Sequence, residues 1–333
     1  MKRILVVHEG RPGHLTQSRG LATALAARSG GTVEVFEVRM TLRGVFRPLL
    51  RYVTGRFARG LPDVWLRRAY AWSGATSALQ ADVIISSGGQ SIAFAVSLAR
   101  RLGTKYIFCG APSPWPANWC DLVLSPVPVP GHANVIETEL LITDMSPERV
   151  AGRGQAYRDA CTRCGGTTLA ALLIGGDSRS HRFAEADWAA LADGLNRLGT
   201  QGWRWMVSTS RRTPPEAERL LRERIDPQWV IKTVWWNTAP ERVMVDFLGA
   251  ADIVAVTQDS LSMLSEAMAS GRPVLSLMPA DVRHSAFIES VLTEQAAKRR
   301  MLCVALATLG ERTYPPSAFA PVTHNLVAST QQR

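Results

Sequence analysis

One strand–turn–helix–strand unit constrains the fold of this chain more than any other stretch. The apolar run at residues 252–256 is typical of a buried strand, and small hydroxyl residues follow it from Thr257 onward. A helical stretch carrying Glu266 comes next, and Gly271 ends it before a second apolar run at residues 273–277. Strands joined through a helix in this order pair in parallel, so the unit predicts an α/β protein.

The same unit carries groups that bind a nucleotide. The free N–H groups at a helix start bind phosphate, and here Ser260 and Ser262 add hydroxyl groups at that point. A carboxylate about one turn farther along, Glu266, accepts hydrogen bonds from sugar hydroxyls. The alternative is an ordinary βαβ unit in which Glu266 lies on a solvated face.

The remaining chain repeats this alternation in two blocks. A length of 333 residues favours two domains. Strand-like and helical stretches alternate up to about residue 125 and again from residue 168, and a proline- and glycine-rich stretch at 126–166 separates the blocks. We expect two doubly wound Rossmann-like domains facing a cleft, at residues 1–150 and 151–333, with the C-terminal segment packing back on the first.

Composition restricts the partners and the compartment. The formal net charge is +10, almost all from arginine, which favours phosphates, nucleotide-linked substrates or acidic lipid. The five cysteines form no regular framework, and no stretch has the length of a signal peptide core or a membrane span. We expect a cytoplasmic protein, and nucleic acid is not an expected partner.

Residues 39–72 do not fit the alternation. Arg39, Arg43, Arg47 and Arg51 recur every four residues among apolar side chains. On a helix this spacing forms an arginine stripe beside an apolar face, as in helices that lie at a membrane surface. Residues 39–68 are therefore a candidate for docking on anionic lipid at the inner face of the inner membrane. The alternative is a helix packed on the sheet with a solvated basic face.

In the first half, the loops after two strands carry candidate acceptor-site groups. Ligands of open parallel sheets bind at the carboxyl ends of the strands. His14 follows the first strand at a helix start and is the candidate general base, with Glu9 as the second candidate. A structural histidine is the alternative. The other residues assigned to the acceptor site or cleft are Gly10, Gly13, Gly88, Gly89 and Gln90, although the last three also fit a tight turn.

In the second half, three successive strand ends are rich in phosphate-binding groups. Glycines, a serine and paired arginines form an anion cradle and a clamp for a diphosphate. These donor-site candidates are Gly175, Gly176, Ser178, Arg211 and Arg212, which join the serines of the first unit described. The chain lacks the fingerprints of dinucleotide-binding, P-loop and serine-hydrolase proteins, and no ligand spacing indicates a metal site.

Several of these motifs resemble those of the elongated-mitochondria, or mitochondrial fission, protein family. The motifs are at residues 10–22, 175–178, 208–214 and 257–274, and the resemblance covers most of the chain. That family is in turn similar to glycosyltransferases of the GT-B fold. The resemblance implies that Glu266 holds a nucleotide ribose. The first loop departs from the transferases at Arg11 and Pro12, where they have small residues.

These observations lead to one hypothesis and two alternatives. The hypothesis is a metal-independent GT-B glycosyltransferase that moves a sugar from a nucleotide-activated donor to a cell-envelope or lipid-linked acceptor. The nucleotide-sugar is a substrate, and no cofactor is expected. One alternative is a nucleotide-sugar epimerase using Asp177, His181 and Asp259. The other is a non-catalytic membrane or partner adaptor, because plant members of the family are discussed as fission factors.

Overall fold

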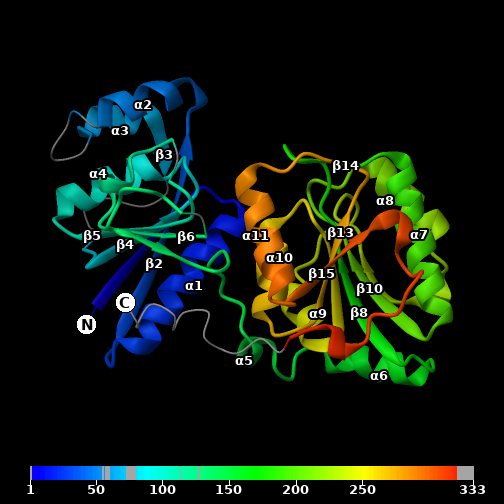
Figure 1. Ribbon diagram of the computed structural model, residues 1–333. Coiled ribbons are helices and arrows are strands. Elements are labelled where there is room, and N and C mark those ends of the chain that lie inside the picture. The colour runs from blue at the N-terminus through cyan, green and yellow to red at the C-terminus, as the bar shows by residue number, and fades with distance from the viewer. Residues whose placement is uncertain are drawn as a thin grey trace. The chain divides into compact units, whose positions relative to one another are not determined.

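The chain forms two compact α/β units in the computed structural model, which describes residues 2–54, 56, 61–72, 80–112, 114–126 and 128–320 (Figure 1). Unit 1 runs to Asp144, and unit 2 begins at Met145. The expected packing of the C-terminal segment on the first domain concerns residues 321–333, which lie outside the described residues.

Unit 1 is built on a seven-stranded sheet in the order β3-β2-β1-β4-β5-β6-β7. All neighbouring strands are parallel except β2 and β3. Its elements are β1 (Lys2–His8), α1 (Pro12–Arg28), β2 (Val33–Leu42), α2 (Arg47–Thr54), α3 (Asp63–Ala69), β3 (Tyr70–Trp72), β4 (Val83–Ser87), α4 (Ile92–Leu102), β5 (Lys105–Cys109), β6 (Leu122–Ser125) and β7 (Val135–Glu137).

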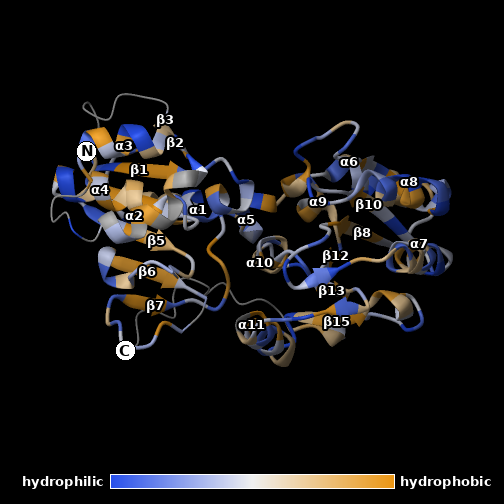
Figure 2. Ribbon diagram, turned by 90° about the horizontal axis from the view of Figure 1, so that it is seen from above, coloured by the Kyte–Doolittle hydropathy of each residue, from blue (hydrophilic) through white to orange (hydrophobic). Residues whose placement is uncertain are grey.

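Helices cover both faces of this sheet because β1 is apolar on both sides. Ile4 and Val6 pack with α1, whereas Leu5 and Val7 pack with α4 on the opposite face. Strands buried on both faces read as continuous apolar runs, and Figure 2 shows β1 and β6 as hydrophobic. The winding on both faces places the loop after β1 next to the loop after β4.

Unit 2 repeats this plan with a six-stranded parallel sheet in the order β11-β10-β8-β12-β13-β15. A small antiparallel pair, β9 with β14, lies apart from it. The elements are α5 (Pro147–Val150), α6 (Gln155–Arg163), β8 (Thr168–Leu173), β9 (His181–Arg182), α7 (Glu185–Thr200), β10 (Trp203–Ser208), α8 (Pro215–Arg224), β11 (Val230–Val234), α9 (Met244–Ala250), β12 (Ile253–Thr257), α10 (Leu261–Ala269), β13 (Val274–Met278), β14 (Asp281–Val282), α11 (Ala286–Ala297) and β15 (Met301–Ala305).

The structure confirms the α/β class but corrects the arginine stripe. Arg39 lies in strand β2 and Arg43 follows it, so only Arg47 and Arg51 belong to helix α2. The strand continues because residues 40–42 pair with the antiparallel strand β3. The proline- and glycine-rich stretch at 126–166, predicted to separate the two blocks, contains strand β7, which pairs with β6 in the sheet of unit 1.

Candidate functional site

Each sheet reverses its winding direction at one point, and the candidate residues gather there. In unit 1 the reversal lies between β1 and β4, and in unit 2 between β8 and β12. Ligands of doubly wound sheets bind outside the carboxyl ends of the strands at such a reversal. The sequence-based candidates at residues 9–14 and 88–90 flank the first reversal, and those at 175–178 and 259–262 flank the second.

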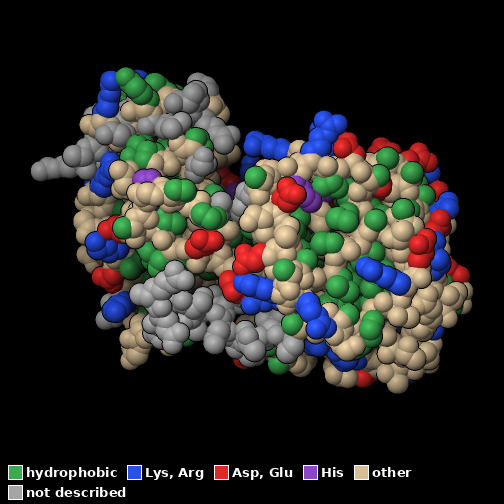
Figure 3. Space-filling view, in the orientation of Figure 1, with side chains coloured by type: hydrophobic (Ala, Val, Ile, Leu, Met, Phe, Trp, Pro, Cys, Tyr) green, Lys and Arg blue, Asp and Glu red, His purple; other side chains and the backbone are tan. Residues whose placement is uncertain are grey.

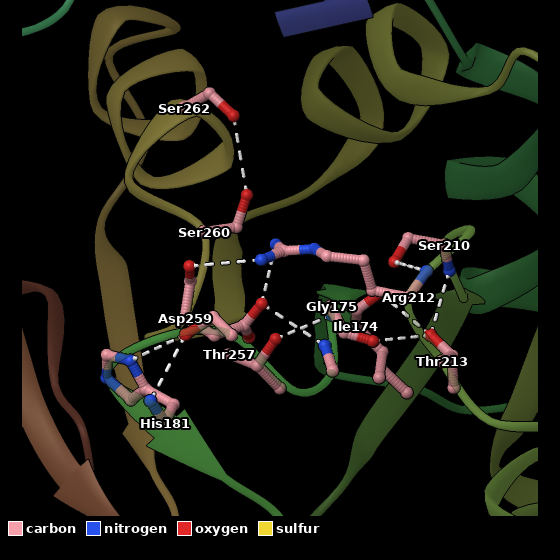
Figure 4. Close-up of polar contacts among 12 residues, drawn as sticks. Ile174, Gly175, His181, Ser210, Arg212, Thr213, Thr257, Asp259, Ser260 and Ser262 are labelled. Carbon is pink, nitrogen blue, oxygen red and sulfur yellow. Dashed lines mark hydrogen bonds and ion pairs between the residues drawn. The ribbon is translucent and has the colours of Figure 1, made fainter. Parts of the chain in front are cut away.

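In unit 2 the two glycines after β8 pack against a buried carboxylate (Figure 4). The Gly175 N–H donates to Thr257 Oγ1 at 2.7 Å, and the Gly176 N–H donates to Asp259 Oδ2 at 3.1 Å. A Cβ atom on Gly175 would lie 2.1 Å from Asp259 Oδ2, and one on Gly176 would lie 2.1 Å from the carbonyl oxygen of Arg212. Both positions therefore require glycine, because protein groups already occupy the adjacent space.

This arrangement differs from the phosphate cradle that the sequence predicts. Each glycine amide already has an acceptor within the protein, and an internal carboxylate lies where the prediction places a phosphate. The sequence pattern gave no indication of this contact, because Gly176 and Asp259 are 83 residues apart. The Gly176 amide thus holds the Asp259 carboxylate, and Gly175 packs closely against it.

Arg212 contacts the same carboxylate. Its Nη2 atom lies 2.6 Å from Asp259 Oδ2, and Nη1 donates to the Asp259 carbonyl at 3.4 Å. The Asp259 side chain is fully buried, whereas 39% of the Arg212 side chain is exposed. The carboxylate therefore fixes the guanidinium on its inner side while the outer side stays accessible to a ligand. Arg211, its predicted partner in a clamp, is exposed.

Burial changes the protonation chemistry of Asp259. Desolvation raises the pKa of its carboxyl group, and contacts with Arg212, the Thr257 hydroxyl and the Gly176 amide oppose that rise. Its Oδ1 atom is buried and lacks a geometrically satisfactory hydrogen bond within the described residues. A carboxylate is costly to bury without partners, so the contacts of Asp259 with Arg212 and the Gly176 amide are needed to keep it in place.

The start of helix α10 provides further donors beside Arg212 (Figure 4). Its first intrahelical bond runs from Leu264 N to Ser260 O, which leaves the N–H groups of residues 261–263 without intrahelical acceptors. In the described part of the chain no side chain caps these amides, and Ser260 Oγ lies 3.4 Å from Ser262 Oγ. Glu266 lies on the same helix and is 8% exposed.

A histidine pair that the sequence reading missed lies beside this site. His181 is buried, and its Nε2 atom lies 3.2 Å from His284 Nε2 and 3.3 Å from Gln258 Oε1. Its Nδ1 atom lies 2.9 Å from Ser180 Oγ. Burial lowers the pKa of both His181 and His284. No local motif signals this pairing, because it joins residues 103 positions apart.

Ser178 and Asp177, two other candidates from the sequence, form hydrogen bonds within the segment between β8 and α7. The Ser178 hydroxyl accepts hydrogen bonds from the N–H groups of Ser180 and His181. Asp177 accepts from the Phe183 N–H at 3.0 Å and pairs with Arg182. Of the three residues named for an epimerase, Asp177 thus holds the turn, while His181 and Asp259 are buried in separate networks.

In unit 1 the reversal carries a histidine–carboxylate pair. Glu9 Oε1 lies 2.6 Å from His14 Nδ1 and 3.2 Å from Arg11 Nε. The Glu9 side chain is only 4% exposed and that of His14 is 31% exposed. A carboxylate accepts hydrogen bonds only, so Nδ1 of His14 is the donor in this contact. This contact orients the His14 ring, and the assignment of Glu9 as the second candidate base stays a prediction.

Glycines make room for this pair. Gly88 has φ +88°, and a Cβ atom there would lie 2.3 Å from His14 Nδ1 and 3.0 Å from Glu9 Oε1. Gly10 has φ +79° and lies against the Arg39 guanidinium, while Gly13 is in the first turn of α1. Gly89 lies near Trp115, and the Gln90 carbonyl accepts from the Tyr70 hydroxyl at 3.1 Å.

No group of three or more histidine, cysteine, aspartate or glutamate residues in the described ranges is arranged to hold a metal ion. Among the helices that the structure describes, none combines the length and the apolar character needed to cross a membrane.

The fold resembles those of solved sugar-nucleotide proteins. An S. aureus MnaA–UDP co-structure matches with a TM-score of 0.56 and 14% identity, covering 93% of this chain and 86% of that one. The E. coli ADP-heptose LPS heptosyltransferase II matches with a TM-score of 0.50 and 13% identity, covering 91% and 90%. At these identities the likeness shows the fold alone, and it confirms the predicted GT-B-like fold with Rossmann-like units.

Sequence comparison gives the family. The uncharacterized protein RP120 of Rickettsia prowazekii (strain Madrid E) is 28% identical over 150 residues, which span 44% of this chain and 42% of that protein's length. The family model described as mitochondrial fission ELM1 matches residues 12–317. As the sequence motifs indicate, the chain belongs to the mitochondrial fission ELM1 family.

Proposed function

We propose that this protein is a GT-B glycosyltransferase that transfers a sugar from a nucleotide-activated donor to a cell-envelope or lipid-linked acceptor. One observation carries the proposal: each sheet reversal has the groups that one half of such a reaction needs. Unit 2 provides cationic and N–H donors for a diphosphate, and unit 1 provides an oriented imidazole base.

In the donor half, Arg212 and the start of α10 bind the diphosphate. The guanidinium presents its accessible side next to the free amides of residues 261–263, and Ser260 and Ser262 add hydroxyl groups. Donors of this kind stabilise the charge that builds up on the diphosphate as its bond to the sugar breaks. Glu266, farther along α10, is assigned to the ribose of the nucleotide.

In the acceptor half, His14 Nε2 takes the proton of an acceptor hydroxyl. The hydroxyl oxygen forms a bond to the anomeric carbon while the bond from that carbon to the diphosphate breaks. Glu9 holds the ring in the required tautomer and stabilises the imidazolium that results, because its buried carboxylate remains 2.6 Å from Nδ1. General-base catalysis of this type accelerates reactions by roughly 10²–10⁴-fold.

The acceptor class and the location are further parts of the proposal. Residues 39–68 are basic and partly apolar, which fits an acceptor carried by an anionic membrane. We place the protein in the cytoplasm, peripherally bound to the inner face of the inner membrane.

A thermal-shift screen tests the donor half directly. Purified protein is mixed with UDP-, GDP-, CMP- and dTDP-sugars, and at least one class should raise the unfolding temperature. Product analysis with that donor then separates the reactions: release of nucleotide in the presence of an acceptor supports transfer, whereas inversion of the sugar at C2 supports an epimerase. The absence of any shift, in folded protein, leaves the adaptor as the better account.

A further inference from the structure

The large exposed hydrophobic side chains of the described residues gather on two short helices. Four such side chains are exposed, and three of them lie on α2 and α3: Leu49 at 43%, Tyr52 at 65% and Val64 at 56%. The fourth, Val35, lies on strand β2. Single exposed apolar residues are common on protein surfaces, whereas a local group of them marks an interaction surface.

These side chains are not needed for the core of unit 1. Both helices already bury a separate face: Leu50 on α2, and Leu66 and Ala69 on α3, belong to the main hydrophobic cluster. Leu49 and Tyr52 point away from the buried Leu50 side because residues next to each other on a helix face different directions. The exposed side chains are therefore free to contact a partner.

The same segment accounts for most of the net positive charge of the protein. Residues 39–72 include eight arginines and one acidic residue, Asp63, which gives +7 of the total formal charge of +10. Asp63 is paired with Arg101. Among the described residues, the exposed arginines on or beside α2 and α3 are Arg43, Arg56, Arg67 and Arg68, and Arg39 is exposed on strand β2. Figure 3 shows hydrophobic and basic side chains next to each other over this part of unit 1.

Tyr52 and Arg56 combine these two properties at one position. The Arg56 guanidinium lies 4.2 Å from the centre of the Tyr52 ring, and Nη2 donates to the phenol oxygen at 2.5 Å. Aromatic rings with a polar tip favour the boundary between water and lipid tails, and guanidinium groups pair there with phosphates.

We propose that the exposed side of α2 and α3, formed by Leu49, Tyr52, Val64 and the four exposed arginines, docks on an anionic lipid bilayer. A bilayer fits better than a nucleic acid because Leu49 and Val64 gain from an apolar medium that phosphates do not offer. It also fits a protein that lies at the surface, with apolar side chains inserted and arginines at the headgroups. This docking does not depend on sugar transfer.

Vesicle sedimentation of the full chain tests the proposal. Wild type should bind phosphatidylcholine vesicles that contain phosphatidylglycerol, bind weakly to phosphatidylcholine alone, and dissociate as salt is raised. Arg67→Glu with Arg68→Glu should lower the partition coefficient by more than about tenfold, since each arginine near such a surface contributes about fivefold. Leu49→Ser with Tyr52→Ser should lower it by a similar factor.

Control substitutions outside the α2–α3 surface show whether a loss of vesicle binding is specific to that surface. Val35→Ser removes the exposed apolar residue outside the surface, and Arg28→Glu with Arg163→Glu makes the same charge change at exposed positions elsewhere. Both should bind vesicles within about twofold of wild type, and every variant should keep the wild-type unfolding temperature and any nucleotide-sugar thermal shift. Failure of wild type to bind, equal losses in the control variants, or binding of DNA in place of vesicles would overturn the proposal.

Discussion

Adding one methyl group at Gly175 tests the packing of the donor site. The backbone of Gly175 lies outside the left-handed region, so alanine costs nothing in conformation there. Its Cβ atom would, however, lie 2.1 Å and 2.5 Å from the two carboxylate oxygens of Asp259. The carboxylate must therefore leave Gly176 N and Arg212 Nη2, which are its partners at 3.1 Å and 2.6 Å.

The expected loss of stability follows from these contacts. Breaking a buried ion pair costs about 3–5 kcal/mol, and we take the lower end because Arg212 is 39% exposed and water screens the pair. Gly175→Ala should therefore lower the free energy of unfolding by about 3 kcal/mol, or the melting temperature by about 6–12 °C in a unit of this size. Urea unfolding of the full chain measures the change.

A double-mutant cycle with Asp259→Ala isolates the cause. Removing the carboxylate alone should cost about 1–2 kcal/mol, because the Gly176 amide loses its acceptor. In that background Gly175→Ala has nothing to displace and should cost less than about 1 kcal/mol, giving a coupling energy of about 2 kcal/mol or more. Equal costs of Gly175→Ala in the two backgrounds would refute the described packing.

Three further substitutions test other parts of the account. Burial raises the pKa of Asp259 above its ordinary 3.8. The free energy of unfolding of wild type should therefore fall as pH rises from 3.8 through the pKa of the folded state. Asp259→Asn should abolish this contribution of Asp259 when unfolding is measured as a function of pH. Gly88→Ala should lower the free energy of unfolding, measured by thermal unfolding, by about 2–3 kcal/mol, because its Cβ atom would displace His14. As the control, Gly89→Ala should cost under about 1 kcal/mol, because the nearest atom to its Cβ would lie at 3.5 Å. Glu9→Gln should lower kcat for transfer at least about 100-fold and leave the donor KM unchanged; an unchanged kcat would contradict the role of Glu9 in supporting His14.

The strands and their winding could be predicted because strands buried on both faces are continuous apolar runs. The strands predicted at residues 252–256 and 273–277 correspond to β12 and β13, each shifted by one residue. The parallel order follows from the alternation with helices, and it places the loops after β1, β4, β8 and β12 at the sheet reversals. The general position of both candidate sites was therefore accessible from the sequence.

The contacts inside the sites were not accessible, because they join distant residues. A Gly-Gly pair after a strand fits a phosphate cradle as well as it fits a buried carboxylate, and nothing near Gly175 identifies Asp259 as its neighbour. Arginines at four-residue spacing match a helix, yet pairing of residues 40–42 with β3 keeps Arg39 in a strand. The His181–His284 pair likewise depends on how β9 meets β14.

Isothermal titration of the full chain with UDP, GDP, CDP and dTDP measures whether the start of α10 and Arg212 bind a nucleoside diphosphate. At least one of these four nucleotides should bind the wild-type protein. Arg212→Ala should then weaken that binding by at least about tenfold, the effect of losing one charge-assisted contact. The control Arg219→Ala, on the exposed side of α8, should leave it unchanged. Absence of binding by all four nucleotides, or equal affinity of wild type and Arg212→Ala, would contradict a nucleoside diphosphate site at Arg212.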